Sequence, residues 1–295
     1  MLVELPRSPH PAGSPAASAV DLLILGAGWT STFLLPLLEE EAIAHAATTR
    51  EGRNGTIPFT FDPESEDHAP YAALPRAATV LITFPLRGEG QSRLLTRLYS
   101  AAHDGHRPRY IQLGVTSIWK VVPGWQTEHS PYDTTDPRAI AEDELLSVAG
   151  ATVLDLSGLW GGARQPRHWI DRVARTKAEL RARGPLHMIH GVDVARAVVA
   201  AHRRFDALRG RRWILCDLHV YDWWELVRDW AAEGLRGEEG EDVARHRELL
   251  GWVGELMLED NVRALPREPS ALQRTLDGRA FWKTVGIWPT QARVR

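Results

Sequence analysis

The stretch that decides the fold is Val20-Asp21-Leu22-Leu23-Ile24-Leu25-Gly26-Ala27-Gly28-Trp29-Thr30-Ser31, in which an apolar run stops at a glycine-rich turn. Helix-forming residues follow over positions 32–44, and a second apolar segment, 43–47, ends in Thr48-Thr49-Arg50. This order predicts a strand, a tight turn, a helix, a second strand and then a basic residue. It is the order in which α/β domains bind the phosphates of a dinucleotide.

The turn has the residue types that a bound pyrophosphate needs. Gly26 permits a tight turn out of the strand, and Gly28 has no side chain, so its backbone can approach a phosphate closely. The following helix presents unpaired N–H groups and the positive end of its dipole, beginning at Trp29, Thr30 and Ser31. Ser31 stands where the full fingerprint has a third glycine. We predict that these residues hold the cofactor phosphates; the alternative is a tight turn without a ligand.

Arg50 decides which dinucleotide is expected. Domains that prefer NAD usually end the second strand with an acidic residue, which accepts from the ribose 2′-hydroxyl, whereas a basic residue suits the 2′-phosphate of NADP. Thr49 and Arg50 can both bond to that phosphate. The sequence therefore predicts NADP(H) as the cofactor; in the alternative, Arg50 only begins the polar loop 51–55.

Composition limits the class of protein and its partners. The chain has 295 residues, 44% hydrophobic and 25% charged, as in globular proteins of one large or two modest domains. Its net charge of −3 gives no general affinity for nucleic acid, and no apolar run is long enough to span a membrane. Residues 1–19 lack the apolar core of a signal peptide and are expected to form a flexible tail. Cys216, the only cysteine, indicates a reducing, cytoplasmic compartment and is expected to be a buried, inert thiol.

Strands and helices alternate through the first half of the chain. The expected strands are 78–84, 109–115 and 151–156, and the expected helices are 92–103 and 139–148. This alternation predicts a Rossmann-type, doubly wound parallel sheet over residues 20–160. Ligands of such sheets lie beyond the carboxyl ends of the strands, which places Phe84 and Pro85 beside the cofactor. The candidate site loops are 26–31, 48–53, 84–91, 115–132 and 157–168.

The pattern changes after residue 160, where helices dominate. The expected helices are 169–183, 192–204, 222–235 and 243–258, with short strands at 186–189 and 213–216 and a polar loop at 236–242. We expect residues 161–295 to form a smaller, mostly helical lobe on the substrate side.

Further motifs follow one another along the chain. They are Val-Thr-Ser-Ile-Trp at 115–119, Glu-His-Ser-Pro at 128–131 followed by Pro137-Arg138 and Glu142, Ser-Gly-Leu-Trp-Gly at 157–161, His-Gly-Val-Asp-Val-Ala at 190–195, and Val-Gly-Ile-Trp-Pro at 285–289. In this order they resemble the extended and atypical branches of the short-chain dehydrogenase/reductase superfamily, which include a bacterial YeeZ-like group. The resemblance implies a nicotinamide cofactor and a catalytic Ser, Tyr and Lys.

That triad is missing from the aligned positions. In the superfamily, the Tyr transfers a proton because the Lys lowers its pKa, and the Ser bonds to the substrate oxygen. The Ser position falls on Val115, the Tyr position on Thr134 or Thr135, and the Lys position on Arg138 or Ala139. Arg138 could replace the Lys as a fixed cation, although an arginine cannot act as an acid or base near neutral pH.

Three other residues are the candidates for catalysis. Thr116 and Ser117 could bond to a carbonyl beside the nicotinamide, and Tyr132 could replace the missing acid. The alternatives are structural: a hydroxyl that satisfies a strand-end backbone group, and a tyrosine that anchors its loop.

No metal site is expected. His187 and His190 would not share a face of a strand, and no other His/Cys cluster has metal-ligand spacing. His190 is instead expected to order the start of the following helix, with Asp193 near the N-cap.

The sequence thus predicts an NADP(H)-binding, atypical short-chain dehydrogenase/reductase that transfers a hydride to or from a small organic substrate. One alternative is a non-redox isomerase, lyase or cyclase with the same fold. Another is a non-enzymatic NADP(H)-sensing protein. A small molecule is the expected partner, and a homodimer is left open.

Overall fold

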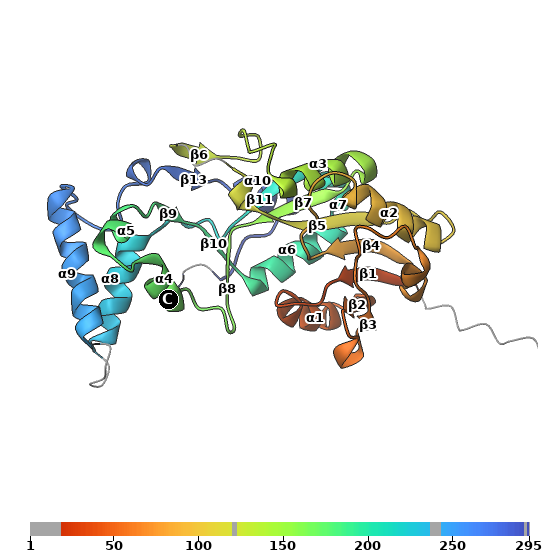
Figure 1. Ribbon diagram of the computed structural model, residues 1–295, viewed down its shortest axis with the longest axis horizontal. Coiled ribbons are helices and arrows are strands. Elements are labelled where there is room, and N and C mark those ends of the chain that lie inside the picture. Colours follow the sequence, from red (N-terminus) through yellow and green to blue (C-terminus); the bar gives the residue numbers. More distant parts are fainter. Residues whose placement is uncertain (1–18, 120–122, 237–242, 292–293, 295) are drawn as a thin grey trace, which may run out of the picture.

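The computed structural model describes residues 19–119, 123–236, 243–291 and 294, so the expected tail (except residue 19) and most of the polar loop 236–242 lie outside it. At its centre is a seven-stranded sheet in the order β11-β7-β5-β4-β1-β2-β3, with every neighbouring pair parallel (Figure 1). The strands are β1 (Val20–Leu25), β2 (His45–Thr49), β3 (Ile57–Pro58), β4 (Ala77–Ile82), β5 (Arg109–Val115), β7 (Thr152–Leu156) and β11 (Arg211–Leu215). The predicted Rossmann-type sheet is confirmed.

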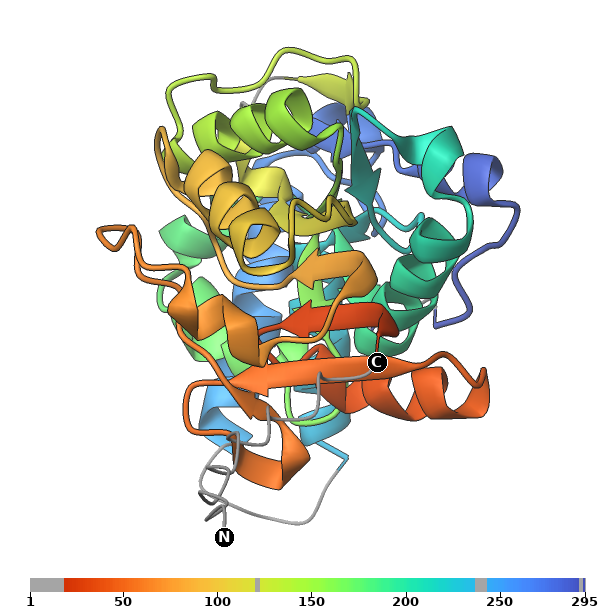
Figure 2. The same cartoon turned by 90° about the vertical axis from the view of Figure 1, so that its right-hand side faces the viewer.

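Helices cover both faces of this sheet, as its strand sequences require. Successive residues of β1 point to opposite faces, and Leu22 to Leu25 are all fully buried. Leu22 and Ile24 share a core with α1 (Ser31–Glu40) and α6 (Gly191–Arg203), whereas Leu23 and Leu25 share one with α2 (Gln91–Ala102) and α3 (Pro137–Ala149). Figure 2 shows these two helix layers on either side of the strands.

The first helix ends earlier than its sequence predicts. We expected it to run to residue 44, but α1 stops at Glu40. Ala42 adopts a left-handed backbone with φ +52°, and the Ile43 N–H donates to the Leu38 carbonyl at 2.9 Å. This C-terminal closure satisfies helix carbonyls and turns the chain into β2.

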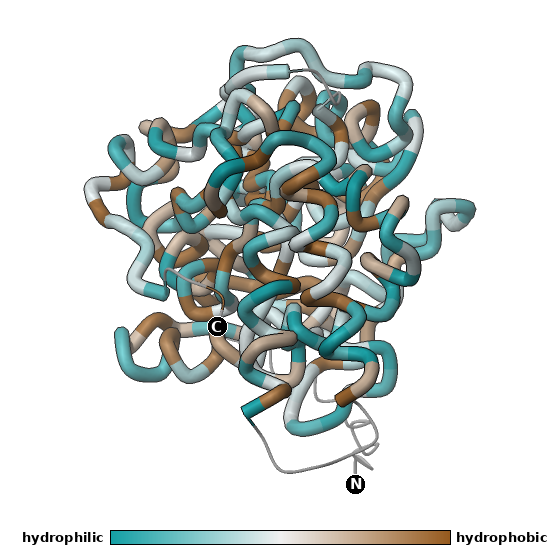
Figure 3. Tube along the Cα trace, turned by 90° about the vertical axis from the view of Figure 1, so that its left-hand side faces the viewer, coloured by the Kyte–Doolittle hydropathy of each residue, from teal (hydrophilic) through white to brown (hydrophobic). Residues whose placement is uncertain are grey.

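The second half of the chain builds a helical lobe and then returns to the sheet. The lobe's core lies around α8 (Trp223–Gly234) and α9 (Val243–Glu259), at the left of Figure 1. Apolar and polar residues alternate along the turns at this end of the molecule (Figure 3). In contrast, α6 and β11 pack with the central sheet, so the chain re-enters the first domain after the boundary expected at residue 160.

The predicted helix 169–183 is wrong as a single element. The structure has a 3₁₀ turn (Pro166–Trp169), α4 (Ile170–Val173) and α5 (Lys177–Arg181) in its place. The chain is extended at Thr176, whose side chain accepts from the Glu179 N–H at 3.1 Å. Threonine is a strong N-cap residue, so it starts a new helix here.

Within the described part of the chain, three pairs of short strands lie outside the central sheet. β8 (Gly158–Trp160) pairs with β10 (Met188–His190), β9 (Pro185–Leu186) with β12 (Tyr221–Asp222), and β6 (Gly124–Gln126) with β13 (Arg274–Leu276). The remaining helices are α7 (Phe205–Leu208) and α10 (Arg279–Val285). Among the described residues, no helix has the length and apolar character needed to cross a membrane.

Candidate functional site

The glycine turn (residues 26–31) is fixed by the ends of the neighbouring strands. Gly26 has φ +97°, and a Cβ built there would lie 2.7 Å from Oγ1 of Thr83. The Gly26 N–H donates to Oγ1 of Thr48 at 2.9 Å, and the Thr83 hydroxyl donates to the Gly26 carbonyl at 2.5 Å. Only glycine fits this conformation and this close approach without strain.

Gly28 is a glycine for a different reason. It is exposed, and a Cβ built there meets no described atom within 4 Å. The helix α1 begins immediately afterwards, and no side chain caps its N-terminus at Thr30. Trp29 Nε1 and the hydroxyl of Ser31 are shielded from solvent and have no hydrogen-bond partner among the described residues. The turn therefore has bare backbone, a helix N-terminus and unused donors in one place, as an anion site requires.

A cavity of about 760 Å³ opens at the carboxyl ends of β1, β2 and β4, and we call it the strand-end cavity. Its lining includes Gly26, Gly28, Thr49, Arg50, Phe84 and Pro85, all of which were predicted from the sequence to bind the cofactor. Arg53 and Arg87 lie in the predicted site loops 48–53 and 84–91 but were not singled out, whereas Phe61 lies outside those loops. Phe61 stacks on Phe84 with 6.0 Å between ring centroids and 16° between ring planes.

The charge of the strand-end cavity is positive. Arg50, Arg53 and Arg87 line it together with one acid, Glu51. All three arginines are exposed, and within the described ranges none of them forms an ion pair. The hydroxyl of Thr49 is already in contact with Oγ1 of Thr56 at 2.7 Å, so the arginines are the uncommitted donors here.

Of the predicted catalytic residues Thr116 and Ser117 at the end of β5, one is buried and the other is exposed. Thr116 is buried, and its hydroxyl donates to the Leu156 carbonyl at 3.3 Å. Arg274 Nη1 donates to the carbonyls of Thr116 and Trp119 at 3.1 and 2.9 Å, which fixes this 3₁₀ turn. Ser117 is exposed at the same strand end. Of this pair, Ser117 is thus the hydroxyl that a ligand can reach.

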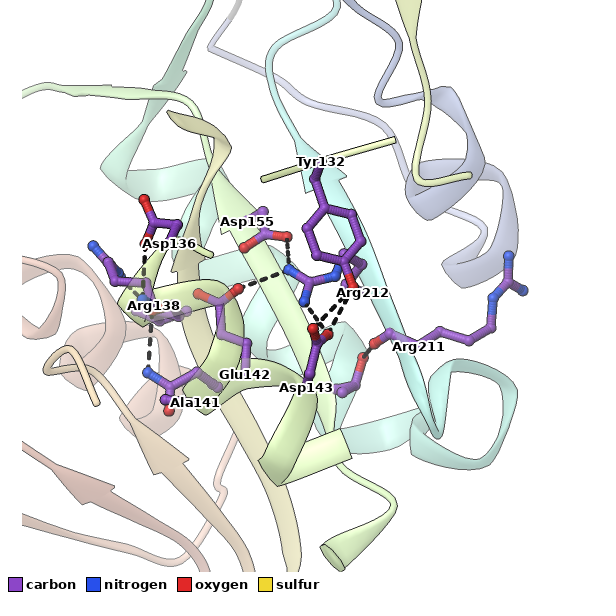
Figure 4. A network of polar contacts seen from close by, with 12 residues as sticks. Tyr132, Asp136, Arg138, Ala141, Glu142, Asp143, Asp155, Arg211 and Arg212 are labelled. Atoms are coloured by element: carbon purple, nitrogen blue, oxygen red, sulfur yellow. Dashed lines mark hydrogen bonds and ion pairs between the residues drawn. The ribbon is translucent and has the colours of Figure 1, made fainter. Parts of the chain in front are cut away.

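Tyr132 is anchored in a cluster of charges. Its hydroxyl donates to the two carboxylate oxygens of Asp143 at 2.9 and 3.0 Å, and the Arg212 guanidinium lies 4.4 Å from its ring centroid (Figure 4). Burial and the Asp143 contact raise the pKa of Tyr132. The hydroxyl is therefore a poor acid in this position.

The same figure shows a group that the sequence did not reveal, the Arg212 cluster, formed by Arg212 with Glu142, Asp143 and Asp155. Arg212 contacts these carboxylates at 2.7, 2.7 and 3.2 Å. Glu142 Oε1 and Asp155 Oδ1 have no partner among the described residues, and both face Gly114, where a Cβ would lie 2.8 and 1.9 Å from them. Burial raises the pKa of Glu142 and of Asp155, and Glu142 raises that of Asp155 further. Both shifts favour the protonated form of this carboxylate pair.

The residues at the triad positions have other roles or lie at the surface. Val115 ends β5, and Thr134 and Thr135 are exposed. Arg138 follows the N-cap Asp136, which accepts from its N–H, and Arg138 Nη2 donates to the Leu113 carbonyl at 3.3 Å.

His187, His190 and Cys216 have structural roles. His190 caps α6 by accepting from the Val192 N–H at 3.1 Å, as predicted. His187 Nε2 accepts from the Leu276 N–H at 3.0 Å, and burial lowers its pKa to about 4. No metal-binding group of three or more His, Cys, Asp or Glu side chains occurs among the described residues. Cys216 is buried, and burial raises its thiol pKa to about 12.

Comparisons with known proteins agree with this architecture. No family model and no curated protein matches the chain. A conserved protein of unknown function from Silicibacter pomeroyi is similar in structure, with TM-score 0.60 and 20% identity over 92% of this chain and 95% of that one. UDP-N-acetylglucosamine 4-epimerase from Bacillus cereus has TM-score 0.58 and 10% identity, over 92% and 94%. The human epimerase family protein SDR39U1, solved with NADPH, has TM-score 0.56 and 15% identity, over 92% and 96%. The chain has the fold of these epimerase and short-chain dehydrogenase/reductase structures, which confirms the sequence resemblance at the level of the fold.

Proposed function

We propose that this protein is an atypical short-chain dehydrogenase/reductase that binds NADP(H) in the strand-end cavity. The observation that carries the proposal is an open glycine turn in the same cavity as three arginines, none with an acidic partner in the described part of the chain. An adenine-side 2′-phosphate would supply the missing anion. SDR39U1 was solved with NADPH, whereas the UDP-glucuronic acid 4-epimerase of Bacillus cereus was solved with NAD, so the likeness alone supports either cofactor.

The lining residues fit the parts of such a cofactor. The glycine turn and the start of α1 would hold the pyrophosphate, because Gly28 leaves its backbone open and no side chain caps the helix N-terminus. The stacked rings of Phe61 and Phe84 offer an apolar wall for the adenine. Arg50, together with Arg53 and Arg87, would bind the 2′-phosphate.

The proposed reaction is hydride transfer with a small organic substrate, and the cofactor supplies the hydride when it is bound. Ser117 would orient the substrate oxygen, since its hydroxyl is exposed at the carboxyl end of β5. Thr116 and Tyr132 donate their hydroxyl protons to the Leu156 carbonyl and to Asp143. The proton would therefore come through Ser117 or from water.

A non-enzymatic NADP(H)-sensing protein is the second candidate. One observation favours it: Tyr132, the phenol nearest the triad positions in sequence, is bonded to a carboxylate and has a raised pKa. A cofactor-binding cavity without a free acid can report the cofactor's redox state without turning it over.

Calorimetric titration with NADPH and NADH tests the cofactor assignment. We expect wild-type protein to bind NADPH more tightly, and Arg50→Ala and Arg87→Ala to weaken NADPH by about 10- to 100-fold with little effect on NADH. Arg228→Ala, an exposed arginine on α8, is the matched control. Equal affinity for the two cofactors would exclude the NADP preference, and binding of neither would exclude the site. Oxidation of NADPH by a panel of small carbonyl compounds would then separate an enzyme from a sensor.

A further inference from the structure

An arginine from the second half of the chain reaches the glycine turn. The guanidinium of Arg164 lies 4.4 Å from the ring centroid of Trp29, the residue that follows Gly28. Arg164 is exposed, and in the ranges that the structure describes it forms no ion pair. A positive charge is thus held beside the turn without a negative charge to balance it.

The loop that carries Arg164 is held by backbone hydrogen bonds and packs against α6. The Gly161 N–H donates to the Arg164 carbonyl at 2.9 Å, and the Arg164 N–H donates back to the Gly161 carbonyl at 3.1 Å. Gly161 has φ +113°, and a Cβ there would lie 2.3 Å from His190 Nε2, so the loop is pressed against the start of α6. These contacts hold the loop beside the glycine turn.

The partner ring is fixed as well. Trp29 packs edge-on against Phe33 with 5.0 Å between centroids, Phe33 packs against His190 at 5.4 Å, and His190 packs against Trp160 at 4.6 Å. This row of rings connects the glycine turn with β8, from which the Arg164 loop continues. A guanidinium over a tryptophan face is favoured, and it keeps its edge N–H groups available to an anion.

We propose that Arg164 is a cofactor-binding residue that pairs with the pyrophosphate of the dinucleotide, while Trp29 holds its guanidinium in place. The inference rests on the proposed function, because it adds a contact at the glycine turn, next to the residues that line the strand-end cavity. Arg164 would supply the positive charge for the pyrophosphate, because the turn itself provides only N–H groups and the hydroxyl of Ser31. This contact also predicts selectivity for ligands that contain a diphosphate bridge.

The test compares a ligand that has the diphosphate bridge with one that lacks it. Wild type, Arg164→Gln and the control Arg167→Gln, an exposed arginine three residues further on, are titrated with NADPH and with adenosine 2′-monophosphate, which has no phosphate at the 5′ position. We expect Arg164→Gln to weaken NADPH binding by about tenfold or more and to leave binding of adenosine 2′-monophosphate within about twofold of wild type. This difference should disappear at high salt. Arg167→Gln should match wild type for both ligands.

The outcomes separate this inference from the proposed function. If wild type binds neither ligand, the proposed function fails. If wild type binds NADPH and Arg164→Gln binds it equally well, only the role of Arg164 fails. Equal losses for both ligands would also overturn that role, because they would show a general disturbance of the cavity. Trp29→Leu completes a double-mutant cycle: the double variant should bind NADPH no more weakly than the worse single variant, and additive losses would contradict the stacking role.

Discussion

At the scale of single residues, the two glycines of the turn have separable tasks. Gly28→Val should abolish dinucleotide binding with little change in thermal stability, because a branched side chain would enter open space that the phosphate needs. Circular dichroism and calorimetric titration with NADPH measure the two effects. Normal NADPH binding by this variant would show that the turn is only structural.

Gly26→Ala is the contrasting variant. Its Cβ would meet the Thr83 hydroxyl and require a left-handed backbone, so the free energy of unfolding should fall by roughly 1–3 kcal/mol. The pair of variants therefore distinguishes a glycine needed for the fold from one needed for the ligand.

Ser117 and Tyr132 are distinguished in the same way. Ser117→Ala should lower any native turnover by about 10²- to 10⁴-fold without changing stability, because its hydroxyl is exposed. Tyr132→Phe should lower the free energy of unfolding by about 1 kcal/mol, because it removes the hydrogen bond to Asp143, and should change turnover much less. Cys216→Ser, in the core, is the control for turnover. A rate loss in Tyr132→Phe as large as in Ser117→Ala would return Tyr132 to the list of proton donors.

At the scale of elements, helix boundaries set by capping are open to a direct test. Thr176→Ala should lower the free energy of unfolding by about 1 kcal/mol, because it removes the acceptor for the Glu179 N–H at the start of α5. Thr176→Ser keeps that acceptor and should retain most of the stability. Urea denaturation followed by circular dichroism measures both variants, and equal stability of Thr176→Ala and wild type would mean that the cap is dispensable.

Secondary structure could be predicted from the sequence where the interactions that determine it lie between residues close together in the chain. The turn at Gly26 and the buried strand before it depend on about a dozen consecutive residues, so both could be predicted. Both ends of β5 were also predicted correctly. At Thr176, the tendency of threonine to cap a new helix opposes an apolar pattern that favours one continuous helix. Periodicity alone does not show which of the two determines the structure. The Arg212 cluster could not be predicted, because its contacts join strands and helices far apart in the chain.

At the scale of the whole molecule, residues 290, 291 and 294 bond to α6 and to β12, which lie much earlier in the chain. Asp193, fully buried in the first turn of α6, accepts from the N–H groups of Thr290 and Gln291 at 2.9 and 2.8 Å. The Val294 N–H donates to the hydroxyl of Tyr221, which in turn donates to Asp217 at 2.5 Å. Asp193 was expected only near the helix cap; its partners lie about a hundred residues later, where no local pattern could reveal them.

The ionisation of Asp217 makes the stability of the fold depend on pH. Burial raises its pKa to about 7, so between about pH 4 and pH 7 the folded state holds a proton that the unfolded chain has lost. Stability from this group is complete below about pH 4 and declines as pH rises towards 7, by at most about 1.4 kcal/mol per pH unit. His187 has the opposite effect on stability. Its pKa is lowered to about 4, so the folded state has lost this proton at a pH where the unfolded chain still holds it, and stability from this group increases as pH rises.

Asp217→Asn isolates the first of these effects. The amide cannot ionise, so the unfolding free energy of the variant minus that of wild type should increase steadily from about pH 4 to about pH 7 and stay constant above that range. Because His187 is present in both proteins, its contribution cancels in the difference. Urea denaturation across this range gives the two curves. A difference independent of pH would mean that Asp217 is already ionised in the folded protein, and the buried contact between Asp217 and Tyr221 would then be that of a carboxylate with its hydroxyl donor.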